Sequence, residues 1–226
     1  ASGKISQKFA LIFSIFLIIL SFLISIIISK DFVFVIFSYL LIQIFYCFKL
    51  KTIPILDIFC ISSGFLLRAI SGGIASSLEI SPWFLLTIGS LSLFLAIEKR
   101  KAELRLVNRG TKLTRKSLKR YSIPLLLRLE NITANSTFIF YALWASGPVL
   151  NGANTSWMLL TVPLVLIGLF RYQLISDPKE IERNLKNNTN KLVNPEKPEE
   201  VLLNDKGIRL CVFLWLASTS LIYFLN

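Results

Sequence analysis

Charged side chains interrupt apolar segments of the sequence at positions where a charge is costly. Asp57 and Arg68 share one apolar segment, and on a helix they would lie about 16 Å apart along the axis, too far to pair with each other. A charge within a membrane segment costs about 2.5–3.5 kcal/mol on insertion scales. Two explanations stay open: ion pairs that hold helices together, or a polar cavity that binds a charged molecule.

A larger group of charges lies at the ends of different apolar segments. Its members are Lys49, Lys51, Asp57, Lys99, Arg100, Glu103, Arg128 and Arg171. Several bases with a few acids suit an anionic phosphate ligand, with the carboxylates left for a metal or for hydroxyl groups. The sequence has no His, which excludes Ser-His-Asp and Cys-His arrangements. Metal-assisted transfer of a phosphorylated substrate is therefore favoured over covalent catalysis.

The elements that must position these side chains are membrane-spanning helices. Of the 226 residues 54% are hydrophobic, and Phe9–Ile28 contains no charged residue. About 20 apolar residues in a helix are enough to cross the roughly 30 Å hydrocarbon layer. The sequence predicts an all-α polytopic membrane protein with a single transmembrane domain. The expected seven spans lie near 9–28, 32–48, 55–75, 82–97, 132–150, 156–175 and 208–225.

The distribution of charge predicts how the spans are oriented. The net charge is +12, and the basic residues concentrate at the N-terminal end and in alternate connections. This pattern follows the positive-inside rule and places the N-terminal side and the loops 98–128 and 176–207 in the cytoplasm. Lys49 and the loop bases from Arg105 to Arg120 are better explained by topology and contact with anionic lipid than by a substrate site.

Four segments resemble a known family. They are YCFKLKTIPILDIFCISSGFLLRAISGG, SPWFLLTIGSLSLFLAIEKRKAEL, FRYQLIS and PEEVLLND, and they extend from Tyr46 to Asp205. The chain is similar to the UbiA-type intramembrane prenyltransferase superfamily, and most similar to its branch that transfers phosphoribose to a polyprenyl phosphate. The resemblance implies a magnesium-dependent transferase in the bacterial plasma (inner) membrane, with phosphoribosyl pyrophosphate and a polyprenyl phosphate as substrates.

The resemblance also implies an arrangement of helices. Family members have nine transmembrane helices around a cavity that is open to the membrane, and an Asp-rich motif after the second helix binds magnesium diphosphate. Ala1–Lys4 resembles the turn that follows this motif. We therefore expect an N-terminally truncated chain whose spans correspond to helices three to nine, with the Mg²⁺ ligands located upstream of Ala1.

The resemblance assigns roles to individual residues. Lys51, Lys99 and Arg100 would bind the donor phosphates, with Arg171 as a weaker candidate. Asp57 and Glu103 are the candidate catalytic residues and would orient the ribose, water or a basic neighbour. Tyr46 would line the cavity, while Arg68 would bind the lipid phosphate or form a structural ion pair. Glu98 stands where close relatives are expected to have a small residue, a departure that can disturb the site.

Two alternatives remain open at this stage. The first is prenyl transfer from a polyprenyl diphosphate to an aromatic acceptor, which would be accompanied by a second Asp pair near residues 98–103. The sequence has Glu103 there instead. The second is a transporter or membrane scaffold without catalytic activity, which more often places charges in broken helices near the bilayer midplane and sometimes shows an internal repeat.

Overall fold

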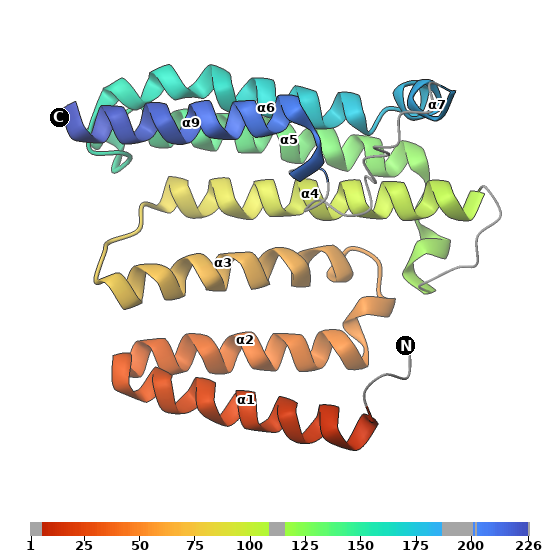
Figure 1. Cartoon of the computed structure of the whole chain (residues 1–226), viewed down its shortest axis with the longest axis vertical. Coiled ribbons are helices and arrows are strands. Elements are labelled where there is room, and N and C mark those ends of the chain that lie inside the picture. The colour runs from red at the N-terminus through yellow and green to blue at the C-terminus, as the bar shows by residue number, and fades with distance from the viewer. Residues whose placement is uncertain (1–5, 109–115, 187–200, 202, 226) are drawn as a thin grey trace.

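The computed structural model describes residues 6–108, 116–186, 201 and 203–225, and most of these residues lie in helices. Figure 1 shows the arrangement. The α-helices are α1 (Gln7–Ile28), α2 (Lys30–Phe48), α3 (Leu56–Ser76), α4 (Pro82–Asn108), α5 (Ile123–Ala145), α6 (Val162–Ile175), α7 (Pro178–Lys186) and α9 (Lys206–Leu225). Short 3₁₀ helices are η1 (Leu50–Thr52), η2 (Lys116–Arg120), η3 (Pro148–Leu150) and η4 (Ser156–Thr161).

Helix α4 lies at the centre of the bundle. It packs against α3 on one side and α5 on the other, while α1 and α2 extend the row beyond α3, and α6 and α9 pack together beyond α5. The N-terminal end of α1 and the connections after α2 and α4 all lie at one end, on the right of Figure 1. The start of α3 and the end of α4, which carry Asp57, Arg100 and Glu103, are therefore brought to the same end.

Six of the described helices are long and apolar enough to cross a membrane. They are Lys8–Ile28, Lys30–Phe48, Leu56–Ser76, Pro82–Asn108, Ser156–Ile175 and Lys206–Leu225. The protein is thus an all-α polytopic membrane protein, as the sequence predicted. The span expected near 132–150 falls on α5, which is also long but carries Arg128 and Glu130. A seventh crossing by α5 stays a prediction.

Polar side chains fix where several helices begin. Ser6, Ser29 and Ser122 each accept a hydrogen bond from a backbone amide in the first turn of α1, α2 and α5, at 3.3, 3.1 and 3.3 Å. Each serine therefore satisfies one amide that has no partner within its helix. The same small polar residues that separate the apolar runs in the sequence thus act as helix caps.

Helices extend into both ends of the expected loop 98–128, because α4 continues to Asn108 and α5 already begins at Ile123. The cytoplasmic location of this loop stays a prediction. No Gly or Pro interrupts the sequence between Glu98 and Asn108, and residues such as Glu, Lys, Arg, Ala and Leu favour a helix. The second expected loop, 176–207, contains α7. Residues 1–5, 109–115 and 187–200 lie outside the described residues. The expectations for the Ala1–Lys4 turn and for these loop segments therefore also fall outside the described part of the chain.

Candidate functional site

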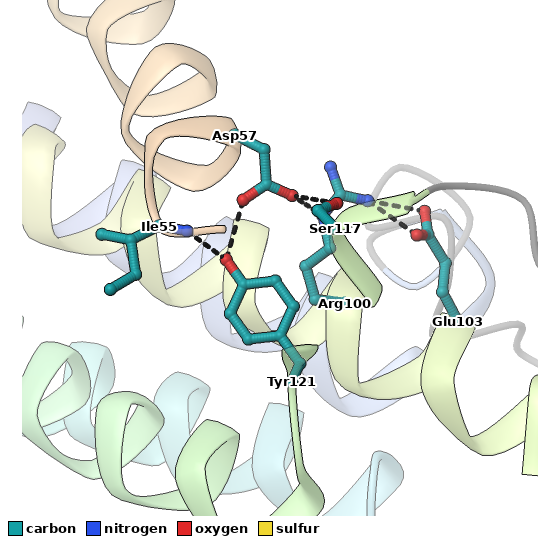
Figure 2. A network of polar contacts seen from close by, with 6 residues as sticks. All are labelled: Ile55, Asp57, Arg100, Glu103, Ser117 and Tyr121. Atoms are coloured by element: carbon teal, nitrogen blue, oxygen red, sulfur yellow. Dashed lines mark hydrogen bonds and ion pairs between the residues drawn. The ribbon is translucent and has the colours of Figure 1, made fainter. Parts of the chain in front are cut away.

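Asp57 is the centre of a buried polar cluster at the start of α3. Its side chain is 0% exposed, and both carboxylate oxygens accept hydrogen bonds (Figure 2). Oδ2 accepts from Nε of Arg100 at 2.9 Å and from Oγ of Ser117 at 3.2 Å, while Oδ1 accepts from the hydroxyl of Tyr121 at 2.7 Å. The cost of burying this charge is thereby offset by three donors from two other parts of the chain.

Arg100 links Asp57 to a second carboxylate. Its Nη1 donates to both oxygens of Glu103, one helical turn further along α4, at 2.8 and 2.7 Å. The side chain of Arg100 is 0% exposed, that of Glu103 is 12% exposed, and Nη2 has no hydrogen-bond partner among the described residues. One guanidinium therefore lies between two carboxylates and keeps one amino group available.

Three more predicted residues lie at the same end of the bundle. Tyr46, near the end of α2, is half-buried and lies close enough to Arg100 for the two side chains to interact electrostatically. Lys99 is half-buried on α4, and Lys51 is exposed in η1. Neither lysine forms an ion pair within the described part of the chain. Their charges are therefore not neutralised by a described neighbour, unlike that of Arg100.

Arg68 lies apart from this cluster, in the middle of α3. Its Nη2 donates to the hydroxyl of Tyr39 at 2.8 Å, and its guanidinium carbon lies 5.4 and 5.2 Å from the ring centroids of Tyr39 and Phe65. Cation–π contacts and this hydrogen bond explain how an exposed arginine is held on the surface of α3. Its assignment to the lipid phosphate remains a prediction.

Arg171 is paired with Asp205, the residue that precedes α9. Its Nε and Nη2 donate to Oδ1 and Oδ2 of Asp205 at 3.2 and 2.8 Å, and Oδ1 also accepts from the amide of Ile208 at 2.8 Å. Asp205 therefore caps α9 and joins it to α6. Burial raises the pKa of Asp205, but hydrogen bonds from Arg171 and from backbone amides outweigh burial and hold this pKa below its ordinary value.

Two substitutions separate the cap from the ion pair. Asp205→Asn keeps an oxygen that can cap α9 and loses the charge, so we expect a loss of less than about 1 kcal/mol, because Arg171 is 42% exposed. Asp205→Ala removes the cap as well, and its cost should be greater by about 1 kcal/mol. Unfolding in mixed detergent micelles measures both, and equal costs would rule out the cap as the main contribution.

A second buried ionic network occupies the opposite side of α4. Nζ of Lys101 contacts Oε1 of Glu98 at 2.5 Å and also contacts Glu130 of α5, which accepts from Nε2 of Gln173 at 3.1 Å. Glu98, Lys101 and Glu130 are each at most 3% exposed. Successive residues of a helix are rotated by about 100°, so the pair Glu98–Lys101 and the pair Arg100–Glu103 point in directions about 160° apart around α4. The two networks therefore lie on nearly opposite sides of this helix.

Sequence reasoning missed this second network. It placed Lys101 within the expected loop 98–128 without assigning it a role, and treated Glu98 only as a departure next to the expected site. The available signal was the spacing of Glu98 and Lys101, three residues apart on one helix face, together with Glu130 in a largely apolar helix. In the structure Glu98 pairs with Lys101, on the side of α4 away from Asp57.

The described residues do not fit a metal site. No group of three or more His, Cys, Asp or Glu side chains within them is placed to hold a metal ion. Both oxygens of Asp57 and both oxygens of Glu103 already accept hydrogen bonds from protein donors. These carboxylates therefore act here as partners of Arg100, and no catalytic step through a metal is assigned to them.

Buried ion pairs at one end of a bundle of apolar helices define an integral membrane protein with a built polar site. The chain belongs to the UbiA prenyltransferase family, which matches residues 1–191. It is 32% identical over 232 residues to the decaprenyl-phosphate phosphoribosyltransferase of Mycolicibacterium smegmatis, covering 99% of this chain and 69% of that protein.

Two further relatives carry the same name. The Mycobacterium tuberculosis protein (strain H37Rv) is 32% identical over 182 residues, covering 80% of this chain and 55% of that protein. The Corynebacterium glutamicum protein is 33% identical over 178 residues, covering 78% of this chain and 49% of that protein. The chain thus spans about half the length of these two relatives in the matched region.

Proposed function

We propose that this protein transfers phosphoribose from phosphoribosyl pyrophosphate to a polyprenyl phosphate in a bacterial plasma membrane. The observation that carries the proposal is the buried Asp57–Arg100–Glu103 cluster at one end of the helices, where a membrane lipid and a water-soluble donor can meet. The names of the relatives, decaprenyl-phosphate phosphoribosyltransferases, support this substrate pair.

The reaction needs no nucleophile from the protein. An oxygen of the polyprenyl phosphate forms a bond to C1 of the ribose, and the bond from C1 to the pyrophosphate oxygen breaks. The electron pair leaves with pyrophosphate, so negative charge grows on the leaving group. Basic side chains fixed beside that group lower the barrier because they stabilise this growing charge. The absence of His from the sequence is consistent with such a mechanism.

Lys51, Lys99 and Arg100 are the proposed contacts of the pyrophosphate group. The two lysines have no described ion-pair partner, and Arg100 has its free Nη2. Asp57 and Glu103 were expected to orient the ribose, water or a basic neighbour. We assign them to the basic neighbour, Arg100, because all their described hydrogen bonds come from protein donors. Tyr46 lines the site beside Arg100.

Arg171 is a weaker contact in this proposal, because both terminal oxygens of Asp205 already bind its guanidinium. Arg68 remains the candidate for the lipid phosphate on the basis of its position within the bilayer part of α3.

Magnesium is proposed as the metal that accompanies pyrophosphate. The family generally depends on a divalent metal. No catalytic step through this metal is assigned to the described carboxylates. The N-terminal side of the chain is proposed to be cytoplasmic, following the distribution of basic residues.

The test is transfer of radiolabelled phosphoribose to decaprenyl phosphate in detergent, using the full reading frame that contains these residues, with and without magnesium. Lys99→Ala should lower kcat/KM by about 10- to 100-fold, because it removes a charge next to the leaving group. Lys30→Ala, an exposed lysine at the opposite end of the bundle, is the matched control and should have no effect.

A parallel reaction with a polyprenyl diphosphate and an aromatic acid tests the rival activity. Prenylated aromatic product in place of lipid-linked phosphoribose would replace the proposed function with prenyl transfer. No product in either reaction, from protein that is folded in detergent, would favour a protein without catalytic activity.

A further inference from the structure

Tyr121 connects the α4–α5 segment to the start of α3. Tyr121 is 6% exposed and packs in a hydrophobic cluster with Ile58, Ile97 and Leu118. Its hydroxyl donates to Oδ1 of Asp57 at 2.7 Å and accepts from the amide of Ile55 at 2.6 Å (Figure 2). One phenol therefore holds both the cap position of α3 and the carboxylate in the first turn of that helix.

The backbone of Ile55 shows that this contact holds a strained conformation. Its φ and ψ are 71° and −51°, in a region that a β-branched residue very rarely adopts. Such strain persists only where the surroundings fix it, and it concentrates at functional sites. The amide of Ile55 donates to Tyr121, and its carbonyl accepts from the amides of Ile58 and Phe59, so hydrogen bonds on both sides hold this conformation.

The Tyr121 phenol remains neutral and so keeps its proton to donate. Burial raises its pKa, and although the amide of Ile55 opposes this, the hydrogen bond to Asp57 raises the pKa further. Asp57 is thus the acceptor of this hydrogen bond. Oδ1 points toward Tyr121, and Arg100 contacts only Oδ2.

The geometry of Arg100 shows what this hydrogen bond changes. Nε and Nη2 lie on the same edge of a guanidinium and together match the two oxygens of one carboxylate. Arg171 binds Asp205 in this way, through Nε and Nη2 to Oδ1 and Oδ2. Arg100 binds Asp57 through Nε alone, and its buried Nη2 has no partner among the described residues.

We propose that Tyr121 is a positioning residue: it holds the Asp57 carboxylate turned so that only Oδ2 faces Arg100, and thereby keeps Nη2 of Arg100 free for an anionic phosphate group. That this phosphate group belongs to phosphoribosyl pyrophosphate rests on the proposed function. The role of Tyr121 is the same whichever molecule accepts the phosphoribose. Without the Tyr121 hydroxyl, the carboxylate can turn so that Oδ1 accepts from Nη2, and the bidentate pair that forms would remove the free amino group from the site.

Tyr121→Phe tests the proposal because it removes the hydroxyl and keeps the ring in its hydrophobic cluster. Inorganic pyrophosphate is the probe, and its affinity is measured calorimetrically in magnesium-containing detergent buffer. We expect the dissociation constant to rise about tenfold, since a hydrogen bond to a charged group is lost. The melting temperature without pyrophosphate should fall modestly, because the amide of Ile55 also loses its acceptor, so the change in affinity decides the test.

Tyr141→Phe is the matched control. Its hydroxyl is also buried and bonded, to Thr161 at 2.6 Å and to Trp215 at 2.6 Å, but it lies in a different hydrophobic cluster. It should leave pyrophosphate affinity unchanged. If Tyr121→Phe lowers the melting temperature and leaves the affinity as it was, Tyr121 is only structural and the proposal is wrong.

The transfer assay separates this proposal from the proposed function. If the wild-type protein transfers phosphoribose and Tyr121→Phe equals it in transfer and in affinity, the function stands and the positioning role falls. If the wild-type protein transfers no phosphoribose but binds pyrophosphate more tightly than Tyr121→Phe, the function falls and the positioning role stands. Absence of pyrophosphate binding by the wild-type protein overturns the positioning role as well.

Discussion

Lys101→Met should destabilise the protein by about 3–5 kcal/mol. The substitution keeps the length of the side chain and removes the charge that lies between Glu98 and Glu130. Both carboxylates are at most 3% exposed, so water cannot replace the ammonium. Removing one partner from a buried ionic group is costly because it leaves the other charges without compensation.

Unfolding in mixed detergent micelles measures the change in free energy. Lys99→Met is the matched control. Lys99 is half-buried two residues before Lys101 in the same helix, but it has no described ion pair, so its substitution should cost less than about 1 kcal/mol. Adding Glu98→Gln and Glu130→Gln to Lys101→Met should recover a large part of the loss, since the triple variant leaves no buried charge in this network. A loss for Lys101→Met no larger than that of Lys99→Met would show that the network contributes little.

Arg100→Lys should lower kcat/KM for phosphoribose transfer by about 100-fold or more, although it keeps the positive charge. A lysine ammonium cannot donate at once to Asp57 and to both oxygens of Glu103 while presenting a further amino group to a ligand. Loss of one preorganised donor to a developing negative charge costs about 10²–10³ in rate.

The same transfer assay checks this prediction, with pyrophosphate affinity as the second measurement. Arg209→Lys, an exposed arginine on α9, is the matched control and should retain wild-type activity. The change at Arg100 should appear in pyrophosphate affinity as well as in turnover. Full activity of Arg100→Lys would mean that a positive charge alone is sufficient, and that the free Nη2 has no role.

The sequence was sufficient to predict the helices because the apolar runs have the length that a bilayer requires. Phe9–Ile28 became α1 almost to the residue, since Ser6 and Ser29 mark its two ends. The expected span ends near residue 97, where hydropathy falls, whereas helix α4 continues to Asn108. A membrane boundary and a helix end are different properties, and hydropathy reports only the first.

The residues that the sequence placed together were those at helix ends on one side of the bundle. Tyr46, Asp57, Arg100 and Glu103 do meet, because alternate connections return the chain to the same end. The contacts of Tyr121 and the Lys101–Glu130 pair were not predicted. Each depends on how the α4–α5 segment folds back or how two helices are rotated against each other, which periodicity alone does not specify.

The two ionic networks on opposite sides of α4 limit how this helix can move. Turning α4 about its long axis would pull Arg100 away from Asp57 on one side and Lys101 away from Glu130 on the other at the same moment. The rotation of α4 is therefore held from two sides, so Arg100 and Lys101 keep their directions together.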